Sequence, residues 1–180
     1  PGCPHRSSIY AIKKAARRLK IKDEDIIYSN DIGCYTLAMQ SPYHMADYCI
    51  CMGSSIGIGS GMAKATKQKI VSLIGDSTFF HAGIPALINS VFNKSSALVV
   101  VMDNRITAMT GHQPNPGMGK TGMGEDTEEL KIEDIARACG VKHVKVIDPI
   151  KAKDFQKTVK EFLNKKEVSV IVARRPCAYL

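Results

Sequence analysis

Aromatic residues are scarce in this sequence: tyrosine and phenylalanine together make up 6% of it, and tryptophan is absent. No uninterrupted apolar run approaches the length of a membrane span, and no secretory signal is recognisable. Internal repeats and low-complexity tracts are also missing. We therefore expect neither a membrane protein nor a repeat array, and the 44% hydrophobic content is typical of a compact soluble enzyme domain.

Acidic residues are outnumbered by basic ones, which gives a net charge of +8. Such a charge can attract nucleic acid, an acidic protein or a phosphorylated ligand. The basic residues are spaced as on solvated helix faces, and no aromatic residues are interleaved with them, so we predict no nucleic-acid partner. An acidic electron carrier or coenzyme A is the alternative. The basic clusters are Lys13–Lys14, Arg17–Arg18, 64–69 and 151–166.

The length of 180 residues fits one domain that can bury a substantial core. The chain begins at Pro1 rather than at methionine. We therefore expect residues 1–180 to be a single domain taken from a larger, multidomain subunit.

Helical and strand patterns alternate along the chain. Alternation of this kind predicts an α/β fold with a mostly parallel sheet and helices on both of its faces. Residues 111–125 are rich in Gly and Pro and show neither periodicity, so we expect a functional loop that covers a cofactor or meets a partner. The expected helices span 7–19, 53–65, 84–92, 132–139 and 150–164, and the expected strands span 26–28, 70–74, 97–102, 143–147 and 168–173.

Two of the apolar strand patterns end in oxygen-bearing side chains. Gly75-Asp76-Ser77 follows the first pattern, and Asp103-Asn104 follows the second. The carboxyl ends of parallel strands meet at one edge of a sheet, where ligands bind. Mg²⁺ takes oxygen ligands from protein, phosphates and water. The pattern therefore predicts a Mg²⁺ site, and the alternative is an ordinary strand-turn-helix unit with Asp76 as the helix N-cap.

These two motifs, at this spacing, resemble the signature of thiamine diphosphate enzymes, in which Gly-Asp-Gly or Gly-Asp-Ser precedes Asn-Asn or Asp-Asn. The resemblance implies that Asp76, Asn104 and the Ile106 carbonyl hold Mg²⁺, and that the ion holds the cofactor's diphosphate. Ser77 stands where many members of the family have Gly. The other residues implied to bind the cofactor are Cys34, Met52, Gly53, Ser54, Gly75, Ser77 and Thr107.

Further motifs narrow the resemblance. The segments Pro1-Gly-Cys-Pro-His-Arg6, Ile32-Gly-Cys34 and Thr107-Ala-Met-Thr-Gly-His-Gln113 resemble the thiamine-binding domain of indolepyruvate:ferredoxin oxidoreductases, in their large (alpha) subunit. That family converts aryl 2-oxo acids to acyl-coenzyme A by oxidative decarboxylation and passes the electrons to ferredoxin. The resemblance implies ferredoxin, coenzyme A and a small (beta) subunit as partners, and a cytoplasmic location.

The glutamate that activates the cofactor in this family comes from a separate pyrimidine-binding domain, and no Glu of this sequence matches it. The resemblance therefore implies a cofactor held at an interface between domains. We expect the isolated chain to bind the cofactor weakly or not at all and to have no turnover.

The six cysteines are unevenly spaced, and we expect no structural disulfides in an intracellular enzyme. By the resemblance, Cys3, Cys34 and Cys177 match three of the ligands of a [4Fe-4S] cluster, and the remaining ligand would precede Pro1. A cluster normally takes four thiolates. The alternative is that these residues are small buried side chains near the cofactor.

Two histidines fall within the motif segments. His81 and His112 are candidates for proton donors or for contacts to a substrate carboxylate. The alternative for each of them is a hydrogen-bonded structural role.

Two other functions are compatible with the sequence. The first is the thiamine-binding subunit of a non-oxidative 2-oxo acid decarboxylase similar to sulfopyruvate decarboxylase, although those proteins lack the Cys-Pro-His start. The second is a binding or assembly domain without catalysis, which the intact Asp76 and Asn104 argue against.

Overall fold

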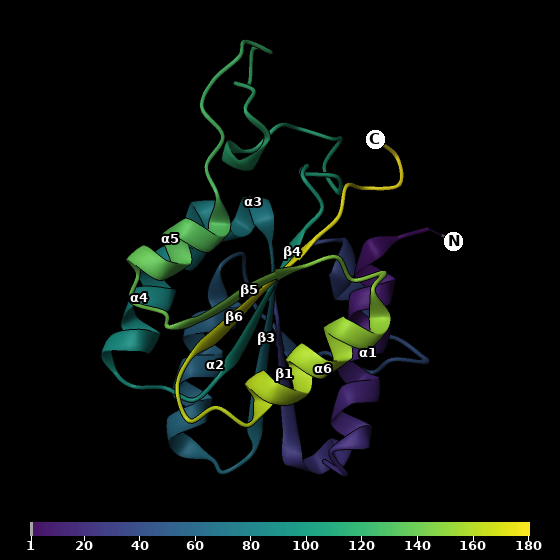
Figure 1. The fold of residues 1–180 in the computed structure, drawn as a ribbon, viewed down its shortest axis with the longest axis vertical. Helices are drawn as coiled ribbons and strands as arrows, with labels where there is room; N and C mark the ends of the chain where they lie inside the picture. The colour runs from purple at the N-terminus through teal and green to yellow at the C-terminus, as the bar shows by residue number, and fades with distance from the viewer. Residues whose placement is uncertain (1) are drawn as a thin grey trace.

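Runs of buried Val, Ile and Leu form the central strands of a parallel sheet (Figure 1). The computed structural model describes residues 2–180, and within them the sheet has six strands in the order β2-β1-β3-β4-β6-β5, all parallel. This arrangement confirms the predicted α/β fold. The strands are β1 (Ile26–Asn30), β2 (Tyr48–Cys49), β3 (Lys69–Gly75), β4 (Leu98–Asp103), β5 (His143–Ile147) and β6 (Ser169–Arg174).

Helices cover both faces of this sheet, as predicted. On one face, α1 and α6 contribute Ile12 and Phe155 to the same core cluster. On the other face, α2, α4 and α5 contribute Ile56, Leu87 and Ala136 to a second cluster. The helices are α1 (Pro4–Arg18), α2 (Ser54–Ala65), α3 (Asp76–Thr78), α4 (Ile84–Phe92), α5 (Ile132–Ala138) and α6 (Ala152–Leu163).

Three local features differ from the sequence prediction. Helix α1 starts three residues earlier than expected because Pro4 occupies its first turn, where no N–H is needed. A 3₁₀ helix at Cys34–Met39 and the two-residue strand β2 are too short to show a periodicity. A π-helical turn at Phe79–Gly83 joins α3 to α4, so the chain is helical from Asp76 onward.

The topology creates a crevice at the carboxyl edge of the sheet. β1 lies between β2 and β3, so the segments that leave the ends of β1 and β3 diverge, and ligands bind at such a point in open α/β sheets. The two ends of the chain lie side by side near this edge (Figure 1): a Cβ built on Gly2 would lie 3.6 Å from the Cβ of Ala178. The edge is thus formed by segments from the whole length of the chain.

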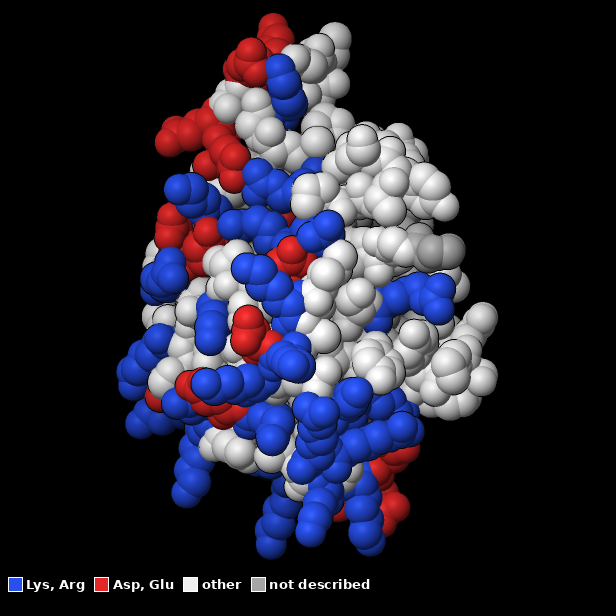
Figure 2. Space-filling model, turned by 45° about the vertical axis from the view of Figure 1, so that its right-hand side comes forward, with Lys and Arg blue, Asp and Glu red and all other residues white. Residues whose placement is uncertain are grey.

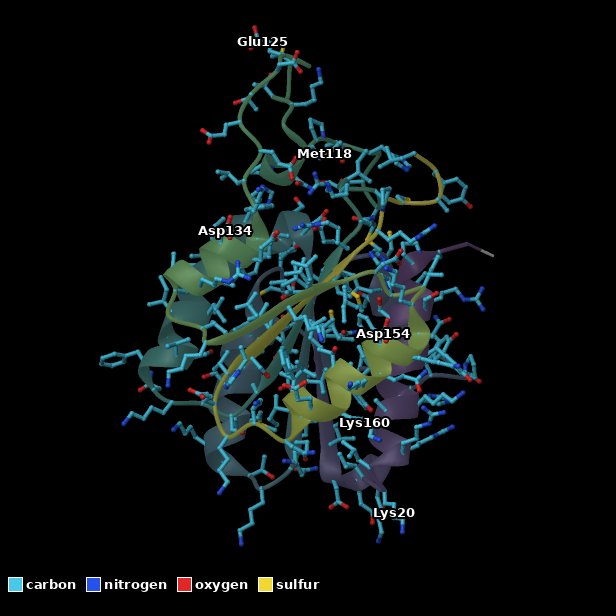
Figure 3. The ribbon with its side chains drawn as sticks, viewed as in Figure 1. Lys20, Met118, Glu125, Asp134, Asp154 and Lys160 are labelled. Atoms are coloured by element: carbon cyan, nitrogen blue, oxygen red, sulfur yellow. The ribbon has the colours of Figure 1, made fainter. Side chains whose placement is uncertain are left out.

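The segment between β4 and α5 extends beyond this edge (Figure 3). Glu125 lies at its far tip, and Met118 lies nearer the sheet. Two isolated antiparallel bridges, Thr107 with Gln113 and Lys120 with Asp126, fold the segment back on itself. The predicted loop at 111–125 therefore belongs to a segment that is folded back on itself, and its tip at Glu125 projects away from the sheet.

The positive charge gathers at the opposite end of the molecule. Lys and Arg side chains crowd the lower part of the face that carries α1 and α6 (Figure 2). Exposed Arg17 and Arg18 end α1, and exposed Lys153 and Lys157 lie on α6, as expected of solvated helix faces. Lys13 differs from this prediction: it is buried, and its ammonium group donates to the Tyr43 carbonyl. Among residues 2–180, no helix combines the length and the hydropathy of a membrane span.

Candidate cofactor site

A cavity opens at the carboxyl edge, beyond the ends of β1, β3 and β4. The segments that line it follow β1 at Ile32–Tyr35, β3 at Gly75–Thr78 and β4 at Asn104–Thr110, and Met52 lines it from the turn before α2. The strand ends are brought together by the ladders of the sheet, in which Gly75 is in register with Met102. The predicted residues that line the cavity are Cys34, Met52, Gly75, Asp76, Ser77, Asn104, Ile106 and Thr107.

Asp76 is a buried carboxylate without a charge partner. Asp76 is 4% exposed, and its Oδ1 accepts a hydrogen bond from the Ser77 N–H (2.7 Å). Its Oδ2 has no hydrogen-bond partner among the described residues. Burial raises the pKa of Asp76 to about 7, and the nearby charge of Asp103 contributes to the increase. A bare carboxylate oxygen in such a place is the donor that a hard cation needs.

Asn104 and Ile106 follow the end of β4 and lie on the same cavity as Asp76. Both are buried, and both line the cavity. The Asn104 carbonyl accepts a hydrogen bond from the Cys177 N–H (3.0 Å), which ties the segment after β6 to this strand end. Arg105, between them, has a φ of 65°, so the backbone turns sharply there and presents Ile106 to the same cavity. The predicted Mg²⁺ ligands are thus brought together, as the motif spacing implies.

Asn115 was not predicted, and it lies on the inner side of the loop near Asp76. Its Oδ1 accepts a hydrogen bond from the Gly117 N–H (2.9 Å), and its Nδ2 has no partner among residues 2–180. The Asn115 side chain is close enough to lower the pKa of Asp76, in the direction opposite to the effect of burial. It links the long loop to the candidate metal site.

An ion-pair network holds the end of β4, next to Asn104. Arg174, at the end of β6, binds Asp103 through Nε (2.5 Å) and Glu133 through both terminal nitrogens (3.0 and 2.6 Å). The hydrogen bonds from Arg174 lower the pKa of Glu133. Because Asp103 lies next to Asn104, this pairing fixes the end of β4 and offsets part of the negative charge around Asp76.

The turn before α2 is held against the cavity by Asp31. The Asp31 carboxylate accepts hydrogen bonds from the N–H groups of Gly53 (2.8 Å) and Ser55 (3.0 Å), at the helix N-terminus where an anion is favoured. Gly53 has a φ of 87°, and a Cβ on it would lie 2.3 Å from the Cβ of Ala82. Only glycine fits there, so the backbone of Met52–Ser54 approaches its neighbours closely, although Gly53 and Ser54 themselves do not line the cavity.

The three predicted cluster cysteines lie near one another at the rim. Cys34 lines the cavity, Cys3 precedes α1, and Cys177 is tied to Asn104. Burial raises the pKa of the Cys34 thiol, and the charges of nearby Cys177 and Cys3 raise it further. No group of three or more His, Cys, Asp or Glu side chains is arranged to hold a metal ion in residues 2–180. The cluster stays a prediction.

The two predicted histidines do not line the cavity. His81 is exposed in the π-helical turn, and His112 is exposed in the loop with a φ of 63°. Instead His5, from the first turn of α1, lines the cavity and is buried. Burial lowers the pKa of His5 to about 4, against a smaller effect of the Met102 backbone, so its imidazole is neutral at pH 7.

The comparisons with known proteins agree with this geometry. Residues 31–173 match the family described as thiamine pyrophosphate enzyme, C-terminal TPP binding domain. The chain belongs to this family. The residues matched extend from Asp31, beside the turn before α2, to Ala173 in β6, and thus include the ends of β3 and β4 and the cavity-lining segment that follows β1. The resemblance identified from the sequence motifs is confirmed.

This thiamine pyrophosphate enzyme domain is also similar to individual proteins. It is 51% identical over 177 residues to the indolepyruvate oxidoreductase subunit IorA of Methanothermobacter marburgensis, covering 98% of this chain and 29% of that protein. It is 46% identical to IorA of Archaeoglobus fulgidus, covering 100% of this chain and 28% of that protein. The sulfopyruvate decarboxylase subunit beta of Methanocaldococcus jannaschii is 30% identical over 124 residues. The chain thus spans less than a third of the IorA relatives.

Among solved structures, the fold is similar to that of a 2-oxoglutarate:ferredoxin oxidoreductase from Magnetococcus marinus with 2-oxoglutarate, coenzyme A and succinyl-CoA bound. The TM-score is 0.86 at 19% identity, covering 98% of this chain and 63% of that chain. A benzoylformate decarboxylase from Polynucleobacter necessarius has a TM-score of 0.64 at 18% identity. At these identities the likeness concerns the fold alone.

Proposed function

We propose that this domain binds the diphosphate of thiamine diphosphate through Mg²⁺ at the cavity beyond β3 and β4. The observation that carries the proposal is the Oδ2 atom of Asp76, which is buried and has no hydrogen-bond partner among the described residues, in a residue that lines the same cavity as Asn104 and Ile106. Leaving such an atom unpaired is costly, and a cation removes the cost. Asp76 Oδ2, the Asn104 side-chain oxygen and the Ile106 carbonyl are the proposed ligands.

The residues around the ligands suit the rest of the cofactor. Gly75, Ser77 and Thr107 line the cavity beside the proposed ion, where the hydroxyl groups can donate to phosphate oxygens. Met52, Gly53 and Ser54 form the rigid turn on the other side, held by Asp31. When bound, thiamine diphosphate supplies the electron sink for the loss of carbon dioxide from a 2-oxo acid. The residues of this chain orient the cofactor and exclude water.

The complete protein is proposed to be a 2-oxo acid oxidoreductase. Its substrate is indolepyruvate or a related aryl 2-oxo acid, its products are acyl-coenzyme A and carbon dioxide, and its electrons pass to ferredoxin in the cytoplasm. The names of the IorA relatives support the substrate class, and the similarity extends over nearly the whole of this chain. The proposed ligands of a [4Fe-4S] cluster are Cys3, Cys34 and Cys177, from the sequence resemblance, with a fourth thiolate that would precede Pro1. In the described residues these three cysteines lie near one another but are not arranged to hold a metal ion.

A pyrimidine-binding domain that carries the activating glutamate is proposed to cover the face formed by α2 and α4, and a small (beta) subunit completes the enzyme. Residues 48–63 and 79–93 contain no Asp, Glu, Lys or Arg, although charged residues make up 23% of the sequence. Ile88 and Phe92 are nevertheless 51% and 81% exposed. Both helices continue from segments that line the cavity, so a domain on this face would reach the cofactor.

The test is reduction of ferredoxin by the complete enzyme with coenzyme A and a panel of 2-oxo acids: indolepyruvate, phenylpyruvate and 2-oxoglutarate. We expect turnover with the aryl substrates, and we expect Asp76→Ala to abolish it. Asp134→Ala is the matched control, because Asp134 lies exposed on α5 (Figure 3), does not line the cavity, and pairs its carboxylate with exposed Arg137.

Two other outcomes would contradict the proposal in distinct ways. Release of carbon dioxide with formation of an aldehyde and no reduction of ferredoxin would indicate a non-oxidative decarboxylase, the function suggested by the similarity to sulfopyruvate decarboxylase subunit beta. Cofactor binding without turnover on any 2-oxo acid would indicate a domain kept for binding or assembly.

A further inference from the structure

A buried tyrosine connects the two sides of the cavity. Tyr35 is 3% exposed and lies one residue after Cys34 in the 3₁₀ helix. Its hydroxyl accepts a hydrogen bond from the Gly75 N–H (2.8 Å) and donates one to the Ile32 carbonyl (3.2 Å). One side-chain atom thus joins the segment that carries Cys34 to the strand end that carries Asp76.

The hydroxyl takes a place that a neighbouring strand has left. The ladder between β1 and β3 ends where the Asp31 N–H donates to the Leu73 carbonyl (3.0 Å), because β1 then turns away into the 3₁₀ helix. Beyond Leu73, the next backbone group of β3 that points toward β1 is the Gly75 N–H, which would be buried without a partner if Tyr35 were absent. The Tyr35 hydroxyl accepts a hydrogen bond from this N–H and so joins the two strands at the point where they separate beside the cavity.

Two glycines provide the space for the ring. A Cβ on Gly33 would lie 2.4 Å from Tyr35 Cε1, and a Cβ on Gly75 would lie 3.1 Å from the same atom. On its other side the ring meets His5 edge to face, with 5.8 Å between the ring centroids. The ring therefore contacts the first turn of α1 near Cys3, the Cys34 segment and the β3 end, which are otherwise separate in the sequence.

We propose that Tyr35 is a positioning residue that sets the separation between the Cys34 segment and the Gly75–Asp76 strand end, and so holds Asp76 in the orientation that binds the cofactor. This assignment rests on the function proposed above. Tyr35 acts through Gly75 and Asp76, whose backbone it fixes.

The test uses the complete enzyme and measures the affinity for thiamine diphosphate at saturating Mg²⁺, with the unfolding midpoint of the cofactor-free protein. Tyr35→Phe keeps the ring and removes both hydrogen bonds, so the strand end that carries Asp76 is no longer fixed. We expect about tenfold weaker binding, a factor comparable to the energy of one such hydrogen bond. Tyr43→Phe is the matched control, because no hydrogen bond involves its hydroxyl in the described residues, and we expect its affinity to stay within about twofold of wild type.

A second control separates positioning from a general loss of stability. Val159→Ala removes buried methyl groups on α6, on the α1 side of the sheet, and lowers the unfolding midpoint without touching the cavity. We expect Val159→Ala to keep the wild-type affinity even if it destabilises the protein as much as Tyr35→Phe does.

Three results would overturn the assignment. If Tyr35→Phe bound thiamine diphosphate with wild-type affinity, the positioning role of Tyr35 would be refuted and the proposed function would stand. Equal losses of affinity in Tyr35→Phe and Val159→Ala would show that Tyr35 acts only through stability. A wild-type enzyme that does not bind thiamine diphosphate at all would refute the proposed function, and the assignment with it.

Discussion

Replacement of Asp76 by Asn should remove the pH dependence that this carboxylate imposes on the stability of the metal-free protein. Asn keeps the shape of the side chain and its acceptor for the Ser77 N–H, and it removes the negative charge. The only change in titration is therefore the loss of one buried carboxyl group. The other carboxylates contribute nearly equally to wild type and variant, apart from Asp103, whose charge acts on Asp76.

The sign follows from the direction of the shift. The pKa of Asp76 is raised from an ordinary value of 3.8 to about 7 in the folded protein, mainly by burial. Between these two values the folded state holds a proton that the unfolded state has released, so stability falls as the pH rises, and the loss is complete above the folded pKa. At about 1.4 kcal/mol per pKa unit, wild type should lose about 3 kcal/mol relative to Asp76→Asn between about pH 5 and pH 8.

The assay is urea unfolding of both proteins, treated with a chelator, across this pH range. We expect Asp76→Asn to be the more stable protein at pH 8, and the difference to shrink toward pH 5. Saturating Mg²⁺ and thiamine diphosphate should raise the stability of wild type and leave the variant unchanged. A difference between the two proteins that stays constant with pH would refute the argument that Asp76 is buried without a charge partner.

Three further predictions concern other parts of the structure. Gly53→Ala should destabilise the protein by about 2 kcal/mol or more in denaturant unfolding, because the φ of 87° and a Cβ position 2.3 Å from the Ala82 Cβ exclude a side chain. Gly61→Ala, which has open space around it in α2, should instead stabilise the protein by about 0.5 to 1 kcal/mol. Equal effects of the two substitutions would contradict the close packing at Gly53. Arg174→Met should destabilise the protein by about 3 kcal/mol at pH 7, because it leaves Asp103 and Glu133 without their partner. The destabilisation should be smaller below pH 4.5, the ordinary pKa of Glu133, because Arg174 lowers that pKa and the ion pair is lost in wild type as Glu133 becomes protonated. A destabilisation independent of pH in the same unfolding assay would contradict the network. Phe92→Asp should weaken copurification with the proposed pyrimidine-binding domain by at least about tenfold if that domain is a separate chain. If the domain is on the same chain, Phe92→Asp should expose the domain boundary to protease. Lys157→Asp on α6 should have neither effect, and equal behaviour of the two variants would place the partner elsewhere.

The sheet and its helices could be predicted because their signals are local and repeated. The strands at 70–74 and 97–102 are continuous apolar runs of the kind that parallel sheets bury on both faces, and the helices at 84–92 and 150–164 show helical periodicity. Polar residues at the ends of adjacent parallel strands must lie close together, so the meeting of Asp76 and Asn104 follows from the strand pattern. The strand β2 has two residues and offers no such pattern.

The supporting residues could not be predicted, because their roles depend on contacts between distant segments. Asp31 resembles any turn residue until α2 brings the N–H groups of Gly53 and Ser55 to it, 22 and 24 residues later in the chain. Tyr35 contacts Gly75 across 40 residues, and Arg174 contacts Asp103 across 71. His5 gave no signal in the sequence, and it lines the cavity because α1 packs beside η2, the 3₁₀ helix at Cys34–Met39.

The proposal that Mg²⁺ and thiamine diphosphate occupy the cavity is tested most directly by calorimetric titration of the complete enzyme with thiamine diphosphate, with and without Mg²⁺. We predict binding that requires Mg²⁺ and that is lost in Asp76→Ala, because Asp76 is the buried carboxylate that the ion would neutralise. Equal binding with and without Mg²⁺, or near-normal binding by Asp76→Ala, would contradict the assignment of the metal site.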